Sequence, residues 1–327
     1  DASLLRIEGR GYDDTPTTWS RLPARAEQTV PPSVWWLSRN TAGLAVRFET
    51  DSTTIGAIWD GGQGMNHMAP TGSNGLDLYY RENDKWVFCA VGRPSLKTTP
   101  TQAILTSDRP SSMTEYLLYL PLYAPVKELK IGIAPGARIA PAAPRPEGER
   151  PIVFYGTSIT QGGCASRAGM CHPALLGRWL DREVINLGFS GSGKMEPALA
   201  DLVSEIDAAL FVLETLPNMT TEMVKERVEP FVRTLRARHP HTPILLVENP
   251  LRDKKHPQNQ ALRAAWENLR AEGVTNLHCL PGEPQLAGLE NGTVDGVHPT
   301  DLGFFRMAEY YLPVVKDLLE RPSATTR

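Results

Sequence analysis

PIVFYGTSITQGG, residues 151–163, is the stretch that decides the fold of the C-terminal half of the chain. Residues 152–155 are apolar and rich in β-formers, and the run stops at Gly156, so the pattern predicts a buried strand that enters a tight turn. Ser158 follows two residues later. The carboxyl edge of a parallel sheet is where α/β proteins place reacting groups, which makes Ser158 a candidate functional residue. A glycine-serine turn without any function is the alternative.

Apolar runs alternate with helical patterns through the rest of this half. Such alternation is typical of a three-layer α/β domain with a parallel sheet, and about five strands fit a small flavodoxin-like sheet. No Gly-x-Gly-x-x-Gly cradle follows the first strand, so we expect no dinucleotide cofactor. We expect strands at 152–155, 184–189, 208–213, 244–247 and 275–280, and helices at 173–182, 194–205, 220–239, 257–272 and 300–319.

The first 134 residues show a different pattern, in which apolar and polar residues alternate. Short alternating strands separated by turn clusters predict an antiparallel β-sandwich of the jelly-roll type, and no helical period competes. Residues 135–150 are rich in proline and predict an extended, semi-stiff linker. The predicted domains are therefore a sandwich at 1–134, a linker at 135–150 and an α/β domain at 151–327.

Two features of the predicted sandwich invite a functional interpretation. Trp35 and Trp36 are adjacent, and we expect one of them to fill the sandwich core, because large aromatic side chains are mostly buried. The loop at 61–75 is long and contains His67. Long loops are often functional. The sequence leaves open whether this loop is a mere connection or brings His67 to the rim of an active site.

Composition and charge argue against several classes of partner. The 327 residues contain 34 Lys and Arg against 37 Asp and Glu, a net charge of −3 without a long run of one sign, so we expect no nucleic-acid partner. No apolar stretch approaches the roughly 18 residues that span a bilayer, so we expect no membrane span. The chain begins at Asp1 without a methionine, so we expect either a trimmed sequence or a mature form after cleavage, and for the mature form a secreted or periplasmic location. The oligomeric state stays open.

The four cysteines, Cys89, Cys164, Cys171 and Cys279, are too few for a disulfide scaffold in a chain of this length. Cys164 and Cys171 are close enough in sequence to pair, but spacing alone does not decide whether they do. No group of cysteines and histidines has the spacing of zinc ligands. The sequence therefore predicts no metal site, and it indicates no organic cofactor.

The far end of the chain supplies what a nucleophilic serine needs, namely a base, a carboxylate that orients the base, and donors for the oxyanion. Asp295 and His298 precede the last predicted helix, while Gly191 and Asn218 follow the second and third predicted strands. Each alone has a simpler explanation. Asp295 could mark a turn, Gly191 could be merely flexible, His298 could be a helix-entry residue, and Asn218 could be a helix N-cap. Together with Ser158 they predict one site at the edge of one sheet.

These residues resemble the sequence blocks of the SGNH or GDSL hydrolases. Gly-Thr-Ser-Ile at 156–159 is similar to the Gly-Asp-Ser-Leu block of that family, and Gly191 and Asn218 match its second and third blocks. Asp295 and His298 match its Asp-x-x-His block. The resemblance covers residues 151 to about 320. It implies a flavodoxin-like fold, a triad of Ser158, His298 and Asp295, and an oxyanion hole from the amides of Ser158 and Gly191 and the side chain of Asn218.

The sequence departs from the pattern of the family in two of its blocks. Thr157 stands where the family has an acidic residue, and Leu216 and Met219 stand where it has a glycine and an aspartate around the third-block asparagine. Both departures spare the triad, but they argue against a general lipase. With a predicted sandwich in front, the whole chain looks more like the two-domain bacterial carbohydrate acetylesterases of the superfamily.

The expected activity is that of a serine esterase that removes a small acyl group, with acetyl as the first choice, from a hydroxyl of a sugar or oligosaccharide through an acyl-enzyme. Arg167, in the loop after Ser158, is a candidate for the substrate rim together with His67, and a surface arginine without a role in binding is the alternative. Two alternatives stay open. One is a short-chain arylesterase or lysophospholipase, and the other is a carbohydrate-binding protein whose hydrolase domain is inactive.

Overall fold

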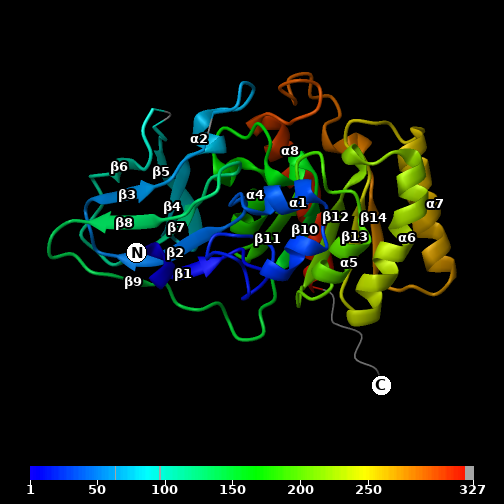
Figure 1. Cartoon of the computed structure of the whole chain (residues 1–327), viewed down its shortest axis with the longest axis horizontal. Coiled ribbons are helices and arrows are strands. Elements are labelled where there is room, and N and C mark those ends of the chain that lie inside the picture. The colour runs from blue at the N-terminus through cyan, green and yellow to red at the C-terminus, as the bar shows by residue number, and fades with distance from the viewer. Residues whose placement is uncertain (63, 96, 321–327) are drawn as a thin grey trace.

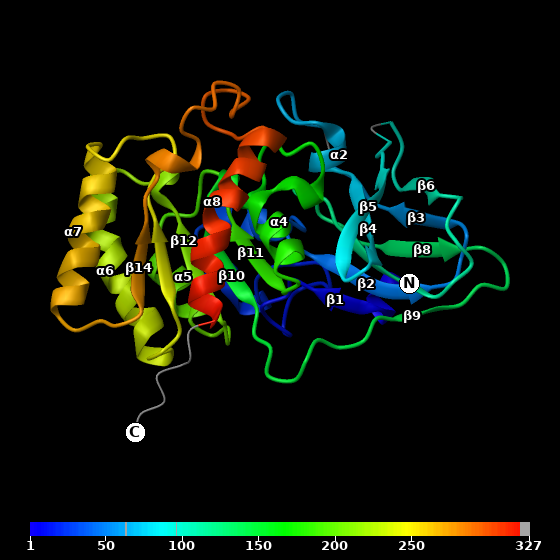
Figure 2. The ribbon, with the colours of Figure 1, turned by 180° about the vertical axis from the view of Figure 1, so that it is seen from behind.

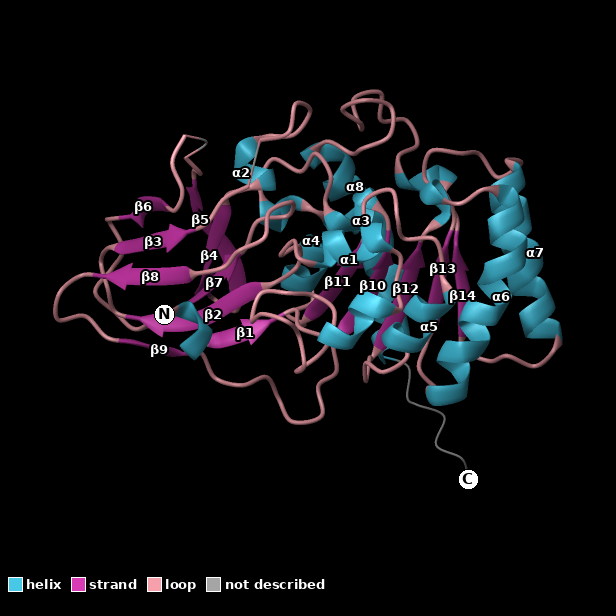
Figure 3. Cartoon of the chain, viewed as in Figure 1, coloured by secondary structure: helices cyan, strands magenta, loops and turns pink. Residues whose placement is uncertain are grey.

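A computed structural model describes residues 1–62, 64–95 and 97–320 (Figure 1). The strand-rich N-terminal part and the α/β C-terminal part lie side by side (Figure 3). Among the described residues we find no helix whose length and apolarity would suffice to cross a bilayer. Short 3-10 helices lie at Ala2–Leu4, Ala24–Gln28, Ala168–Met170, Leu216–Asn218 and Glu283–Gln285.

A parallel sheet of five strands forms the centre of the C-terminal part, in the order β11-β10-β12-β13-β14. This 2-1-3-4-5 order is that of flavodoxin-like sheets. Gly156, the last residue of β10, pairs with Gly188 on one side and Glu214 on the other, so three neighbouring strands end at one edge. The strands are β10 (Ile152–Gly156), β11 (Val184–Gly188), β12 (Leu210–Glu214), β13 (Ile244–Val247) and β14 (Leu277–Leu280).

Helices cover both faces of this sheet, namely α4 (His172–Trp179), α5 (Pro197–Val203), α6 (Thr221–Arg238), α7 (Pro257–Ala271) and α8 (Asp301–Glu320). Successive side chains of each buried strand point to opposite faces. Val153 and Tyr155 therefore pack with α5, α6 and α7. Ile152 and Phe154 pack with α4 and α8, which lie in front of the sheet in Figure 2. The expected strands and helices of this half are confirmed, and the last of them, expected at 300–319, runs from Asp301 to Glu320.

Two antiparallel sheets form most of the N-terminal part and share a hydrophobic core that includes Val46, Trp59 and Leu78. The larger sheet contains β1 (Arg6–Glu8), β2 (Ala45–Thr50), β7 (Thr114–Tyr119), β4 (Leu76–Glu82) and β5 (Lys85–Gly92), with β9 (Ile139–Pro141) paired to β2. The smaller sheet contains β6 (Thr101–Thr106), β3 (Ile55–Trp59) and β8 (Leu129–Ile133).

The segment between β1 and β2 corrects the expectation that no helix occurs in the first 134 residues. It contains α1 (Pro32–Ser38), which begins with a proline, a residue suited to the first helical position. Trp35 of this helix packs against the core of the parallel sheet, and Trp36 is exposed. The expectation that one of these two tryptophans fills the sandwich core is therefore wrong, because the tryptophans buried there are Trp19 and Trp59.

The same segment also contacts the carboxyl end of β11 in the parallel sheet. Arg21 is fully buried and donates to the main-chain oxygens of Asn186 at 3.0 Å and Gly188 at 2.7 Å, at the end of β11. Tyr12 and Leu22 belong to the hydrophobic core beneath α5 and α6. Residues 10–43 are thus part of the packing of the α/β domain, although they precede most of the antiparallel strands in sequence.

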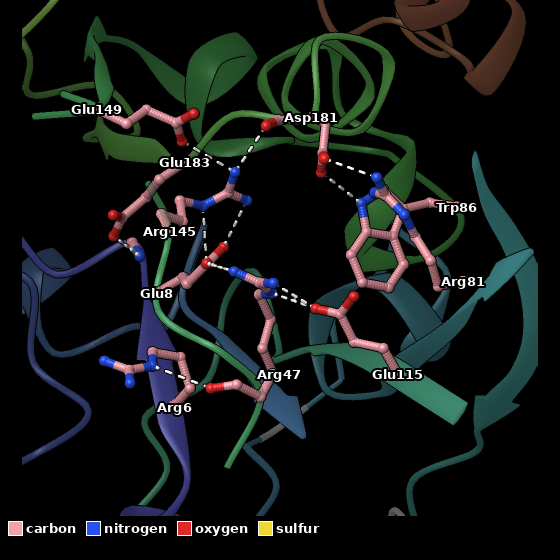
Figure 4. Close-up of polar contacts among 12 residues, drawn as sticks. Arg6, Glu8, Arg47, Arg81, Trp86, Glu115, Arg145, Glu149, Asp181 and Glu183 are labelled. Atoms are coloured by element: carbon pink, nitrogen blue, oxygen red, sulfur yellow. Dashed lines mark hydrogen bonds and ion pairs between the residues drawn. The ribbon is translucent and has the colours of Figure 1, made fainter. Parts of the chain in front are cut away.

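A network of ion pairs joins the two parts of the molecule (Figure 4). Arg145, in the segment predicted as a linker, donates to Glu8 of β1 at 2.8 Å, to Glu149 at 3.1 Å and to the main-chain oxygen of Asp181 at 2.6 Å. Glu8 also pairs with Arg47 of β2 at 2.7 Å. Because Arg145 is fixed in this way and β9 joins the larger sheet, residues 135–150 are not a free spacer.

Candidate active site

Ser158 is the first residue of α3 (Ser158–Gln161), directly after β10 ends, and it is 7% exposed. Thr157 caps this helix. Its Oγ1 accepts from the Ile159 amide at 3.2 Å, while Oγ1 of Thr160 accepts from the Thr157 amide at 3.2 Å. This capping box closes the turn without the acidic residue expected from the family pattern. The Ser158 amide, at the first helical position, lacks an intrahelical partner.

The loop before α8 brings a histidine and a carboxylate to this serine. The imidazole of His298 lies with Nε2 2.9 Å from Ser158 Oγ and with Nδ1 2.8 Å from Oδ2 of Asp295. The other carboxylate oxygen of Asp295 accepts from the amides of Val297 at 3.0 Å and His298 at 2.8 Å. Gly296 has φ of 84°, in the left-handed region that glycine adopts without strain, and this permits the tight turn.

The charge of Asp295 determines which ring nitrogen of His298 carries the proton. Partial burial raises the pKa of Asp295, but the hydrogen bonds from the His298 amide and ring and from the Val297 amide outweigh it and lower the pKa to about 2. The carboxylate is therefore ionised at any pH above about 4. An ionised carboxylate only accepts, so Nδ1 of His298 donates to it, and the lone pair of Nε2 is left for the Ser158 hydroxyl.

Gly163, in the loop after α3, and Tyr123, from the N-terminal part, flank the turn that carries Ser158. A Cβ at Gly163 would lie 2.9 Å from Cδ2 of His298 and 3.0 Å from the Tyr123 hydroxyl, so no side chain fits there without moving the imidazole. The Tyr123 hydroxyl donates to the main-chain oxygen of Ser158 at 3.4 Å. The turn that carries Ser158 is thus supported by a residue from the end of the antiparallel sheet.

Gly191 and Asn218 lie on the two sides of Ser158, after the strands that flank β10. Gly191 is exposed, has φ of 67°, and would have no atom within 4 Å of an added Cβ. Nδ2 of Asn218 donates to the main-chain oxygen of Phe189 at 3.4 Å, which ties the asparagine to the loop of Gly191. The alternative role of Asn218 as a helix N-cap is excluded, because Thr220 caps α6.

We predict that Asn218→Ala lowers kcat by about 10²- to 10³-fold with KM nearly unchanged, because a donor to the oxyanion acts only in the transition state. Thr220→Ala is the matched control. It removes the acceptor of the Met223 amide and is expected to cost about 1 kcal/mol of helix stability without affecting kcat. Steady-state kinetics and thermal melting of both variants separate the two roles. A normal kcat per folded Asn218→Ala molecule, with a lowered melting temperature, would make the asparagine purely structural.

A buried carboxylate behind the nucleophile escaped the sequence prediction. Glu214, the last residue of β12, accepts from the hydroxyls of Thr160 at 2.7 Å and Tyr311 at 2.5 Å and from Nε2 of His172 at 2.9 Å. Since Thr160 also closes the capping box around Ser158, Glu214 helps to position α3. The only signal in the sequence is a charged residue in line with four buried apolar ones, Leu210, Phe211, Val212 and Leu213.

The pKa of Glu214 sets the expected pH dependence of its contribution. Burial raises this pKa, but the interactions with His172, Tyr311 and Thr160 outweigh burial and bring it below the ordinary value of 4.5. A depressed pKa in the folded state means that the stabilisation is complete above about pH 4.5 and is lost as the pH falls through the folded-state pKa.

We predict that Glu214→Gln lowers the free energy of unfolding by about 3–5 kcal/mol at neutral pH, because the amide places a donor against donors in a buried network. The difference from wild type should shrink below about pH 4.5. Urea unfolding at both pH values measures this, with Glu226→Gln on the exposed side of α6 as the control. A Glu214→Gln protein as stable as wild type at neutral pH would show that the network carries no net stabilisation.

The loop at 61–75 reaches the candidate site through His67. Gln63 of this loop lies outside the described residues. The rings of His67 and His298 are 5.6 Å apart between centroids. The loop docks through α2 (Pro70–Ser73), where Thr71 Oγ1 donates to the main-chain oxygen of Ser166 at 2.5 Å. Gly72 packs against the loop after α3, where an added Cβ would lie 2.0 Å from the main-chain oxygen of Ala165.

Arg167 does not lie free at the rim. Its Nη1 donates to both carboxylate oxygens of the buried Asp77 at 3.1 Å and to the Tyr79 hydroxyl at 2.5 Å, and its guanidinium lies over the Phe88 ring at 4.2 Å. All three partners belong to β4 and β5. That Arg167 also contacts substrate stays a prediction, while the observed contacts of Arg167 are structural. It joins the loop after α3 to the N-terminal sheet, because an isolated buried carboxylate such as Asp77 requires a cation.

The first two cysteines that follow α3 in sequence are free. Cys164 and Cys171 are both buried and unpaired, so the open question of a disulfide is answered in the negative for this structure. Cys164 has φ of 71° and its thiol donates to the main-chain oxygen of His67 at 3.3 Å. This contact is a second link between the loop at 61–75 and the loop after α3.

Comparison with known proteins places the chain in a family. The model of the GDSL-like lipase/acylhydrolase family matches residues 149–316, which include Ser158, Asp295 and His298. The chain belongs to this family. A second model, described as the N-terminus of SGNH-hydrolase-type esterases, matches residues 1–139. The resemblance to two-domain members of the SGNH or GDSL superfamily is thereby confirmed. No match was found among curated proteins.

Several solved structures share the fold of most or all of this chain. A GDSL-like lipase from Bacteroides ovatus is 36% identical, with a TM-score of 0.91, over 99% of this chain and 98% of that chain. A salicylyl-acyltransferase from a tetracycline biosynthetic pathway is 20% identical, with a TM-score of 0.78, over 98% and 96%. A family two carbohydrate esterase from Clostridium thermocellum, solved with cellohexaose, is 15% identical, with a TM-score of 0.60, over 85% and 93%.

Proposed function

We propose that the protein is a serine esterase that removes a small acyl group, acetyl first of all, from a hydroxyl of a carbohydrate through an acyl-enzyme intermediate. One observation carries this proposal. The hydroxyl of Ser158, the imidazole of His298 and the carboxylate of Asp295 form a continuous chain of hydrogen bonds of 2.9 and 2.8 Å. Membership of the GDSL-like lipase/acylhydrolase family supports the general class of reaction.

In the acylation step, Ser158 Oγ attacks the ester carbonyl carbon while its proton passes to Nε2 of His298. Asp295, which is ionised throughout the working pH range, holds the imidazole in the required tautomer and stabilises the imidazolium. The oxyanion of the tetrahedral intermediate accepts from the amides of Ser158 and Gly191 and from Nδ2 of Asn218. His298 then gives its proton to the departing alkoxide, and the acyl group stays on Ser158.

In the deacylation step, His298 takes a proton from water, which attacks the acyl carbonyl. The same donors stabilise the second intermediate. Its collapse breaks the bond to Ser158 Oγ, returns the proton from His298 to the serine and releases the carboxylic acid. The chain's own residues are sufficient for every proton transfer in this cycle.

The surroundings of Ser158 support a small acyl group and a carbohydrate as the parts of the substrate. The serine is 7% exposed and flanked by Tyr123 and Gly163, which favours a short acyl group. Asn66 and His67 are exposed polar residues, His67 lies next to His298, and side chains of this kind suit sugar hydroxyls. The fold is also that of family two carbohydrate esterases, one of which was solved with cellohexaose.

A substrate panel tests the proposal. We expect turnover of p-nitrophenyl acetate to exceed that of the palmitate ester, and acetylated xylose or glucose to be deacetylated with release of acetate. Turnover of lysophosphatidylcholine in preference to acetylated sugars would favour the lysophospholipase alternative. An absence of turnover on all of these esters by folded protein would favour the binding-protein alternative.

We predict that His67→Ala raises KM for an acetylated sugar by about fivefold, the effect of one hydrogen bond of about 1 kcal/mol, and leaves kinetics on p-nitrophenyl acetate nearly unchanged. The aryl ester has no sugar hydroxyl to bind. His241→Ala, in the turn before β13 on the far side of the sheet, is the control. Equal effects of His67→Ala on both substrates would rule out a role in sugar recognition.

A further inference from the structure

Four potential metal ligands converge beside the nucleophile, although their sequence spacing gives no hint of a metal site. One ligand atom each from His67, Cys164, Asp295 and His298 can be chosen so that all four lie within 4.8 Å of one another. They come from three segments, namely the loop between β3 and β4, the loop after α3 and the loop before α8. The fold assembles this cluster from residues up to 231 positions apart in the chain.

The ligand set is selective in its chemistry. Two imidazoles, one thiol and one carboxylate form a mixed set of nitrogen, sulfur and oxygen donors, and four such donors are what tetrahedral Zn²⁺ sites use. Thiolate and imidazole favour Zn²⁺ and similar transition metals, whereas Mg²⁺ and Ca²⁺ prefer oxygen ligands. The cluster therefore suits Zn²⁺ and disfavours the abundant hard cations.

Neighbouring contacts already orient two of the ligands. Oδ1 of Asn66 lies 3.0 Å from Nδ1 of His67. An amide oxygen only accepts, so this nitrogen donates and Nε2 of His67 keeps the lone pair with which histidine binds metals. The Cys164 thiol donates to the main-chain oxygen of His67, which holds the sulfur against the same loop. Binding releases the thiol proton to solvent as the metal–sulfur bond forms.

We propose that His67, Cys164, Asp295 and His298 form an inhibitory Zn²⁺ site that switches the hydrolase off. Binding of the ion is independent of the proposed function, but its inhibitory effect rests on that function. Inhibition is expected because both ring nitrogens of His298 are needed for catalysis. Nε2 must take the Ser158 proton and Nδ1 must donate to Asp295, so coordination through either atom removes a step of catalysis.

Direct binding is tested first, in a protein that needs no activity. Co²⁺ replaces Zn²⁺ as a visible probe, and we expect Ser158→Ala protein to show a cobalt–thiolate charge-transfer band that added Zn²⁺ abolishes. Introducing Cys164→Ser should remove this band. Introducing Cys89→Ser, at the half-buried free cysteine of β5, should leave it unchanged. A missing band, or a band that survives Cys164→Ser, overturns the proposal.

Inhibition is tested in the active protein. Zn²⁺ should inhibit hydrolysis of p-nitrophenyl acetate reversibly, with activity restored by EDTA, whereas Mg²⁺ and Ca²⁺ should have no effect. The Cys164→Ser enzyme should keep its basal activity. It should need at least about tenfold more Zn²⁺ for half-inhibition, because loss of a residue that only supports a metal ligand already lowers metal affinity by about that factor. Equal Zn²⁺ sensitivity of wild type and Cys164→Ser contradicts the proposal. Cobalt binding at Cys164 in a protein without esterase activity would overturn the proposed function and retain the site.

Discussion

Ser158→Ala is expected to lower kcat for ester hydrolysis by about 10⁴-fold or more, because it removes the atom that forms the acyl-enzyme. The fold should remain intact. Oγ of Ser158 is hydrogen-bonded to His298 alone among the described residues, and the capping box of α3 is built by Thr157 and Thr160. Initial rates on p-nitrophenyl acetate measure the loss, and circular dichroism and thermal melting check the fold.

Ser204→Ala provides the matched control for this variant. Ser204 follows α5, and its hydroxyl donates to the main-chain oxygen of Asp201, away from the candidate site. It should keep wild-type kinetics. If folded Ser158→Ala protein retained most of its activity, another residue would have to be the nucleophile.

Asp295→Asn is expected to lower kcat by about 10⁴-fold with little change in stability. The oxygen of the new amide would stay with the amides of Val297 and His298, which now hydrogen-bond Oδ1. The amide nitrogen would then face Nδ1 of His298 and donate to it. The imidazole would have to carry its proton on Nε2, where it cannot accept the proton of Ser158.

The pH profile and an isosteric control check this explanation. Because the pKa of Asp295 is about 2, wild-type activity should show no loss from this carboxylate at any pH above about 4. Asp253→Asn, an exposed residue before α7, should behave like wild type. An Asp295→Asn enzyme with more than about a tenth of wild-type kcat would mean that the carboxylate does not set the tautomer of His298.

The sequence was sufficient to predict the α/β domain and the residues of its edge. Each strand from β10 to β14 is a short apolar run, and each main helix has an apolar stripe, so local periodicity determines them. Ser158, Gly191 and Asn218 follow strand ends, and a parallel sheet brings such positions together. The distance of 2.9 Å between His298 and Ser158 could not be predicted in this way, because it depends on the path of the loop before α8.

Other features depend on contacts between parts that no local pattern connects. The helical segment around Val34 and Trp35 packs on the parallel sheet, so its partner lies more than a hundred residues away in sequence. Arginine is usually a surface residue, and only the structure shows that Arg167 binds the buried Asp77. Likewise, spacing rules for metal ligands consider neighbours in sequence, and therefore could not bring Cys164 and His67 together.

The most direct test of the central claim is to identify the nucleophile chemically. Diethyl p-nitrophenyl phosphate transfers a phosphoryl group to an activated serine and releases p-nitrophenolate. Tandem mass spectrometry then locates the adduct. We expect one phosphoryl group per chain, on Ser158, appearing in parallel with the loss of activity, and no adduct in Ser158→Ala protein. Inactivation with Ser158 unmodified, or a label on another residue, would contradict the assignment of Ser158, His298 and Asp295 as the catalytic residues.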